Sequence, residues 1–157
     1  MVKKIFHAYQ QATVEEYISD NEPLAKFLED NKDYEVASGR LKVSAFYPSN
    51  KYGAVSVFRT INLSDSEIWK IADEFVAPVR KPKNGQYRAR ADLVASSIRE
   101  TGLKVEAETS EHPRHADIVG WITPPREIGS EEAIQEIREK KAEYAAKLFQ
   151  IAEVVVR

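Results

Sequence analysis

The spacing of hydrophobic residues in the first part of the chain is mainly that of helices. Thr13 and Glu16 are three residues apart, as in a capping box, and predict a short helix over residues 13–18. Apolar residues then recur at intervals of three and four after Pro23, which is placed where a helix tolerates proline. We therefore predict a second helix over residues 21–31.

A period of two follows, which is typical of strands that bury one face. It predicts a strand over residues 41–45 and another over residues 54–61, joined as a hairpin through a bend around Gly53. The same alternation recurs at residues 86–91 and 103–107. The polar face of the last of these strands is charged, so we expect it to face water.

Capping residues and helix breakers predict two helices among these strands. The capping box Ser64–Glu67 stands directly before an apolar stripe, and this helix is expected to end near residue 76 or 77 because Pro78 follows. Asp92 is expected to cap the other helix. Gly102 is expected to end it in a left-handed conformation.

A long amphipathic helix is predicted at the C-terminal end. Ser130 has the position of its N-cap, and apolar residues continue at helical spacing to Val155. We expect this helix to cover a sheet, whereas the β-branched residues 154–156 favour a frayed or extended end. The order of elements predicts an α+β fold: a single domain with a mainly antiparallel sheet of about four to five strands, packed by helices.

Composition limits the classes of protein to which this chain can belong. With 157 residues and 43% hydrophobic content, one globular domain is expected. The formal net charge of -2 gives no global attraction for nucleic acid or an anionic membrane. Cysteine is absent, which excludes disulfides, thiolate metal sites and cysteine nucleophiles. Without a secretory signal or an apolar run of roughly 20 residues, we expect a soluble, cytoplasmic protein with no membrane partner.

The densest group of chemically useful side chains is residues 110–121, with the sequence SEHPRHADIVGW. Pro113 disfavours a strand interior, so we predict a turn over residues 111–114 and a strand from His115 onward. Alternation gives this strand an apolar face and an open face. The apolar face carries Ala116, Ile118 and Gly120, and the open face carries His115, Asp117, Val119 and Trp121.

His115 and Asp117 on one strand face form the first candidate site. A carboxylate beside an imidazole favours the charged imidazolium, an arrangement that suits general acid/base catalysis, with Asp117 orienting the ring. The alternative is an ordinary surface pair. His112 and His115 also have a spacing found among metal ligands, but a zinc site here would need carboxylates such as Glu111. We therefore predict no metal site and no cofactor.

Basic residues form the second candidate site, because the planar guanidinium group suits phosphate and carboxylate. The alternative is that Arg88 and Arg90 belong to a solvated strand face and pair with Glu106 and Glu108 on a neighbouring strand. Arg59 shares a strand face with two valines, where a charge needs a partner. The predicted anion-binding residues are Arg59, Arg88, Arg90, His112 and Arg114.

Three functions are compatible with these features. No GxSxG, Walker, GxGxxG or HExxH motif is present, so the leading hypothesis is a non-enzymatic binding or adaptor module whose partner is another protein. The alternative is a metal-independent enzyme acting on a phosphate-containing substrate, a nucleotide or RNA, with His115 as acid/base. A second alternative is nucleic-acid binding through a local basic patch. The strings GRLKVSAFYP and HPRHADIVGW resemble those of short prokaryotic proteins, and this resemblance implies no activity and no site.

Overall fold

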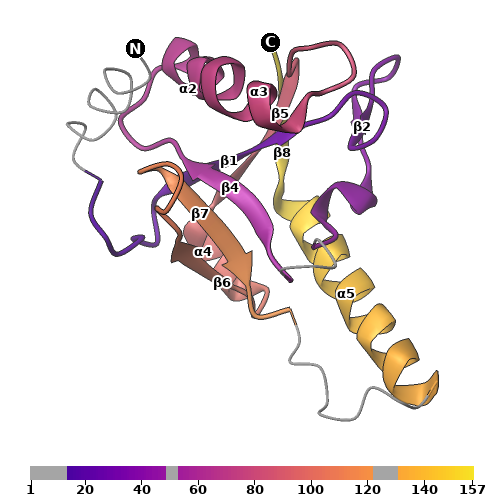
Figure 1. Ribbon diagram of the computed structural model, residues 1–157. Coiled ribbons are helices and arrows are strands. Elements are labelled where there is room, and N and C mark those ends of the chain that lie inside the picture. The colour runs from indigo at the N-terminus through magenta and orange to yellow at the C-terminus, as the bar shows by residue number, and fades with distance from the viewer. Residues whose placement is uncertain (1–13, 49–52, 122–130) are drawn as a thin grey trace.

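A six-stranded antiparallel sheet forms the centre of the computed structural model, which describes residues 14–48, 53–121 and 131–157 (Figure 1). The predicted α+β class is confirmed, but the sheet has more strands than the four to five expected. Its strands are β1 Pro23–Leu28, β4 Val55–Arg59, β5 Ala89–Val94, β6 Lys104–Ala107, β7 His115–Val119 and β8 Glu153–Val156. They lie in the order β6-β7-β4-β1-β5-β8.

Helical layers cover both faces of the sheet. One layer is a continuous stretch of α2 Asp65–Ile71, the π-helical turn η2 Ala72–Val76 and α3 Ala77–Arg80, packed on Phe27 and Phe58. The other layer contains the 3₁₀ turn η1 Val43–Phe46, α4 Ala95–Glu100 and α5 Glu131–Ile151, packed on residues such as Leu24, Val57 and Ile118. In Figure 1, α2 and α3 lie over the β1 side of their face, and no described helix covers β6 and β7 on that face.

The central strand β1 replaces the helix predicted over residues 21–31. Leu24 and Leu28 point into one core, and Ala25 and Phe27 point into the other. A strand that is covered on both sides needs apolar residues without alternation, and such a run has the same spacing as a helical stripe. The helix prediction is wrong because burial on two faces, and not amphipathicity, explains this apolar run.

Residues 14–18 are not helical, although a helix was predicted from Thr13, which lies outside the described residues. Their backbone carbonyls accept hydrogen bonds from arginines elsewhere in the fold. Arg59 Nη2 donates to the Tyr17 carbonyl over 3.4 Å, and Arg99 Nη2 donates to the Ile18 carbonyl over 2.5 Å. These tertiary hydrogen bonds satisfy groups that a helix would otherwise pair.

The strand predicted over residues 41–45 is also wrong. The short strand β3 Arg40–Leu41 pairs with β2 Tyr34–Glu35 and is followed by η1. Ala45 and Phe46 are adjacent yet both buried, which a helical turn permits and a strand with one wet face does not. β4 lies inside the strand predicted over residues 54–61, but it pairs with β1 and β7 and so does not form the expected hairpin.

The capping box at Ser64 is confirmed. The Glu67 N–H donates to Ser64 Oγ over 3.2 Å, and the Ser64 N–H donates to Glu67 Oε1 over 3.1 Å. The helical stretch continues through Pro78 to Arg80, beyond the predicted end at residue 76 or 77. Pro78 lies in the first turn of α3, directly after the wider π-helical turn, where its missing N–H leaves no hydrogen bond broken.

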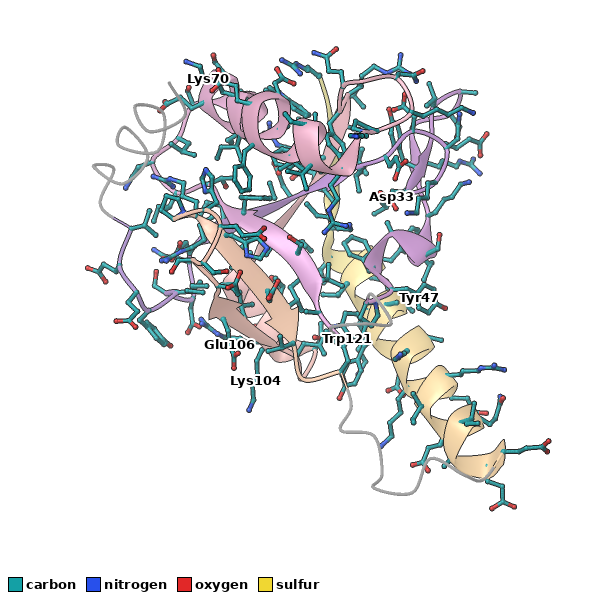
Figure 2. All side chains as sticks on the ribbon, in the orientation of Figure 1. Asp33, Tyr47, Lys70, Lys104, Glu106 and Trp121 are labelled. Atoms are coloured by element: carbon teal, nitrogen blue, oxygen red, sulfur yellow. The ribbon has the colours of Figure 1, made fainter. Side chains whose placement is uncertain are left out.

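The strand–helix–strand segment from β5 to β6 differs from the prediction mainly in where β5 ends and α4 begins. Asp92, expected to cap a helix, lies inside β5 and accepts a hydrogen bond from Arg90 Nε over 2.9 Å. Gly102 ends the helical segment with a φ of +100°, as predicted. The strand predicted over residues 103–107 is confirmed, and Lys104 and Glu106 point outward from its wet face (Figure 2).

The C-terminal helix packs on the sheet through the part nearest its end. Ala145 and Leu148 are buried in the core, whereas Ile134 near its start is exposed. The proposed cap Ser130 lies outside the described residues. The extended alternative for residues 154–156 is confirmed, because they lie in β8 beside β5. No described helix is both long and apolar enough to cross a membrane.

Candidate functional site

The turn before β7 carries two of the predicted site residues, His112 and Arg114, and both are buried. The turn expected at residues 111–114 is present: the His115 N–H donates to the His112 carbonyl over 3.1 Å, and the Arg114 N–H donates to His112 Nδ1 over 3.0 Å. The buried His112 ring packs edge-on against Phe58 and Phe75. Burial lowers the pKa of His112 to about 4, with smaller contributions from its basic neighbours His115 and Arg114.

β7 begins at His115 as predicted, and its two faces differ in the expected way. Ala116 and Ile118 are buried in the core, while His115 and Asp117 lie on the opposite face with side chains 15% and 24% exposed. Trp121, predicted on the open face, is instead buried, and its Nε1 donates to the Ile118 carbonyl over 3.0 Å. The strand alternation stops before Trp121 because Gly120 turns the chain with a φ of +87°.

Strand register brings side chains from three strands together on this open face. β7 lies between β6 and β4, with Asp117 opposite Ser56 on one side and opposite Glu106 on the other. Just beyond β6, the Glu108 N–H donates to the His115 carbonyl over 3.0 Å. Side chains on the same face of neighbouring strands lie within contact distance, so the His115 ring is surrounded by groups from both neighbours.

Ser56, His115 and Glu108 form a hydrogen-bonded triad. His115 Nε2 lies 2.6 Å from Ser56 Oγ, and Nδ1 lies 2.8 Å from the Glu108 carbonyl oxygen and 3.1 Å from Glu108 Oε2. Both neighbours of Nδ1 are acceptors, so Nδ1 carries the hydrogen in the neutral imidazole. Nε2 then accepts the hydrogen bond that the Ser56 hydroxyl donates, which is the arrangement needed for a histidine to take a proton from a serine.

The two carboxyl groups beside His115 have pKa values shifted in opposite directions. Hydrogen bonds from Ser110 lower the pKa of Glu108 and favour its ionised form. Burial raises the pKa of Asp117, and the charges of Glu108 and Glu106 add to this rise, while His115 opposes it. Asp117 Oδ1 is 3.5 Å from His115 Nε2, which is beyond ordinary hydrogen-bond distance. Glu108 therefore makes the hydrogen bonds to the imidazole Nδ1, whereas the sequence suggested Asp117 as the partner of the ring.

Among the described residues, Glu108, His115 and Asp117 also bring potential metal-ligand atoms within 4.8 Å of one another. A divalent cation on His115 Nε2 and Asp117 would need the position that the Ser56 hydroxyl takes, 2.6 Å from Nε2. Glu108 would then remain on the Nδ1 side as an outer carboxylate. His115 Nε2 can thus serve the serine or a metal ion, but not both at once.

Arg59 and Arg114, both predicted to bind an anion, are engaged by partners within the fold. Arg59 is buried and forms a two-pronged ion pair with Glu22, through Nε and through an Nη2 to Oε2 contact of 2.9 Å. The partner that the sequence required for Arg59 is therefore Glu22. Arg114 is buried as well, and its Nη1 donates to the backbone carbonyls of Arg59 and Ile61 over 3.0 and 2.9 Å.

Arg88 and Arg90 lie just before and within β5, and the strands β4 and β1 separate them from β7. Arg88 forms an ion pair with Asp30. Arg90 binds Asp92 over 2.9 Å and Asp65 over 2.8 Å. These arginines therefore pair with acids on their own side of the sheet, and the structure brings them neither to His115 nor to the acids of β6.

Ser56 and Glu108 are the site residues that sequence reasoning missed. Ser56 shares a strand face with Phe58, opposite the face that carries Val55 and Val57. Glu108 follows the alternating charges of the strand at residues 103–107. Glu108 was therefore recognisable as a polar position on an open strand face, whereas no local pattern marked Ser56, and only the pairing of β4 and β6 with β7 brings both to the same histidine.

Comparison with known proteins finds no matching family model, no similar curated protein and no similar solved structure.

Proposed function

We propose that the protein is a metal-independent hydrolase in which Ser56 is the nucleophile, His115 the general base and Glu108 the residue that positions the imidazole. The triad carries this proposal: one imidazole has a serine hydroxyl 2.6 Å from Nε2 and a carboxylate 3.1 Å from Nδ1. Acyl-transfer enzymes on unrelated folds activate a serine through contacts in this order. The enzyme alternative is thereby favoured over a module that only binds, and the nucleophile comes from β4.

The proposed reaction transfers an acyl group first to Ser56 and then to water. Ser56 Oγ attacks the carbonyl carbon while its proton moves to His115 Nε2, and the departing alcohol or amine takes that proton as its bond to the carbonyl carbon breaks. Water then attacks the acyl-serine and gives a proton to Nε2, which returns it to Ser56 Oγ. The net reaction converts an ester or amide and water into an acid and an alcohol or amine.

The backbone of β4 supplies a donor for the oxyanion of this reaction. The Arg59 N–H donates to the Arg114 carbonyl over 2.8 Å, so the alternation of the antiparallel ladder turns every second N–H of β4 toward β7. The Ser56 N–H therefore points the other way, toward β1. β1 pairs with β4 at Leu24 and Ala25 and is not paired opposite Ser56. A donor aimed at this open position would stabilise negative charge that develops beside the nucleophile.

A fluorophosphonate probe tests the activated serine without knowledge of the substrate. The folded protein is expected to gain one adduct, located at Ser56 by peptide mass spectrometry, and Ser56→Ala is expected to abolish it. His115→Ala should slow labelling by about 100-fold or more. Glu108→Gln should slow it less, because the Glu108 carbonyl still accepts the Nδ1 hydrogen, and should change the pH dependence of the labelling rate, which a purely structural role would not.

Two controls make this test specific. Ser44 lines the same cleft as Ser56 but makes no hydrogen bond to a histidine in the described part of the chain, so Ser44→Ala should label at the normal rate. Labelling should also persist after dialysis against a chelator. Absence of an adduct in the folded wild-type protein would overturn the proposal and leave the binding module as the better hypothesis, whereas labelling that requires an added divalent cation would overturn the metal-independent mechanism.

A further inference from the structure

The sheet opens between β1 and β4, and a cleft lies in this opening. Among the described residues, β1 pairs with β4 at Leu24 and Ala25, whereas its pairing with β5 runs along its whole length. Figure 1 shows β4 turning away from β1. The cavity has a volume of about 470 Å³, and Asp33 and Tyr47, labelled in Figure 2, mark its side nearest β2 and η1. The other lining residues include Lys26, Glu29, Lys32, Ser56 and Arg80.

Lys26 contributes the unusual charge in this cleft. It lies in the central strand β1, on the same face as the fully buried Leu24 and Leu28, and is itself half-buried. In the part of the chain that the structure describes, its ammonium group has no ion pair and no hydrogen bond to a side chain or carbonyl. Burial lowers the pKa of Lys26; the charges of Asp33 and Glu29 oppose this effect, while those of Arg80 and Lys32 add to it. A charged lysine in such a position is destabilised unless an anion joins it.

Among the described residues, neither of the two acids that line the cleft forms an ion pair with Lys26. Asp33 Oδ2 accepts the Glu29 N–H over 2.8 Å, and the Glu29 carboxylate pairs with Lys32 over 3.6 Å. Arg80 is exposed at the rim and adds a further positive charge. The lining of the cleft thus carries three basic side chains, Lys26, Lys32 and Arg80, against the two acids Glu29 and Asp33.

We infer that this cleft binds the carboxylate or phosphate group of a small molecule, with Lys26 as its ionic partner. Because Ser56 lines the same cavity, the molecule would be an ester or amide that carries a negative charge away from its reacting carbonyl. This assignment of the anion to the substrate depends on the function proposed for Ser56, whereas binding of the anion does not. Arginine and lysine groups that steer such an anion are already present at the rim.

Anion binding can be measured directly in the folded protein. Succinate and inorganic phosphate, titrated separately in low-salt Tris buffer, are expected to shift the backbone amide NMR signals of Phe27 and Ser56, and the two titrations show which anion is preferred. Lys26→Met should weaken binding at least tenfold, and Lys26→Arg should retain most of it. Lys104→Met is the matched control, because this exposed lysine of β6 lies outside the cleft and should bind as wild type does.

Ester hydrolysis then tests the link to Ser56. With the 4-nitrophenyl esters of acetate and of succinate, Lys26→Met should lower kcat/KM for the anionic ester at least tenfold while changing it for the neutral ester by less than twofold, and Ser56→Ala should abolish both. Hydrolysis of both esters that is insensitive to Lys26→Met, or binding of neither anion, would overturn the inference and leave the function of Ser56 standing. Binding that depends on Lys26 without hydrolysis of either ester would support the anion site and overturn the proposed hydrolase.

Discussion

Arg59, which is buried, and Lys26, which is half-buried, lie on neighbouring strands, yet their surroundings differ completely. Arg59 is 2% exposed and is held by the Glu22 carboxylate and the Tyr17 carbonyl. Lys26 faces a cleft and has no such partner among the described residues. Burial of a basic residue alone therefore does not indicate a binding site. The two residues differ in whether other groups of the fold accept hydrogen bonds from their side-chain N–H donors.

This difference predicts the largest loss of stability when Arg59 loses its partner. Glu22→Ala leaves the guanidinium buried without a counter-charge, and we expect unfolding free energy to fall by about 3–5 kcal/mol in urea titrations. Asp20→Ala is the matched control, because its ion pair with Arg99 is exposed and should contribute less than about 1 kcal/mol. Equal effects of the two changes would contradict the comparison.

His112 is a third basic residue in this comparison, and it is buried in its neutral form. Its pKa of about 4 is below the ordinary 6.5, so the unfolded chain takes up a proton at a higher pH than the folded protein. The stabilisation that comes from enclosing neutral His112 is fully present above about pH 6.5. As the pH falls toward 4, the free energy of unfolding decreases by up to about 3 kcal/mol, because the unfolded chain binds the proton first.

Urea midpoints measured between pH 7 and 4 test this dependence. His112→Asn keeps an acceptor near the Nδ1 position but does not titrate, so the variant should lose less stability over this interval than the wild type does. The role assigned to His112 is refuted by equal pH dependence in the two proteins.

Arg88 is an intermediate case, because it is half-exposed while its partner Asp30 is buried. Burial alone would raise the pKa of Asp30, but hydrogen bonds from Arg88, Asn84 and Tyr34 together lower it. Arg88→Ala leaves two of these donors in place, so we expect a loss of only about 1 kcal/mol in chemical denaturation. A loss as large as that of Glu22→Ala would show that the two remaining hydrogen bonds, from Asn84 and Tyr34, do not compensate for burial of the Asp30 carboxylate.

Lys26→Met should have the smallest effect on stability, and of opposite sign. Methionine has a similar length and no charge to desolvate, so unfolding free energy should stay constant or rise by up to about 1 kcal/mol. Thermal and urea unfolding of the variant measure this directly. A clear destabilisation would mean that Lys26, like Arg59, supports the fold.

Elements whose signals are local could be predicted from the sequence. The capping box at Ser64, the turn at Gly102 and the start of β7 all depend on residues within a few positions of one another. β1 could not be assigned in this way, because its apolar run has helical spacing and only its position between β4 and β5 makes it a strand. The 3₁₀ turn at residues 43–46 was missed for a related reason: alternation in a short segment does not reveal which neighbours bury it.

The candidate site was predictable only in part for the same physical reason. The open face with His115 and Asp117 follows from alternation within one strand. The contacts of His115 depend on register between strands that are distant in sequence, which placed Ser56 and Glu108 beside the ring. The basic residues near them in the sequence found partners elsewhere, as with Arg59 and Glu22.

The short pairing between β1 and β4 has a mechanical consequence. It joins two three-stranded blocks, β6-β7-β4 and β1-β5-β8, and bending of the sheet is concentrated where two strands are paired over the fewest residues. Ser56 belongs to the first block and Lys26 to the second. A molecule bound to both residues would connect the two blocks across the opening. Its binding should therefore reduce bending of the sheet and slow amide hydrogen exchange along the facing edges of β1 and β4.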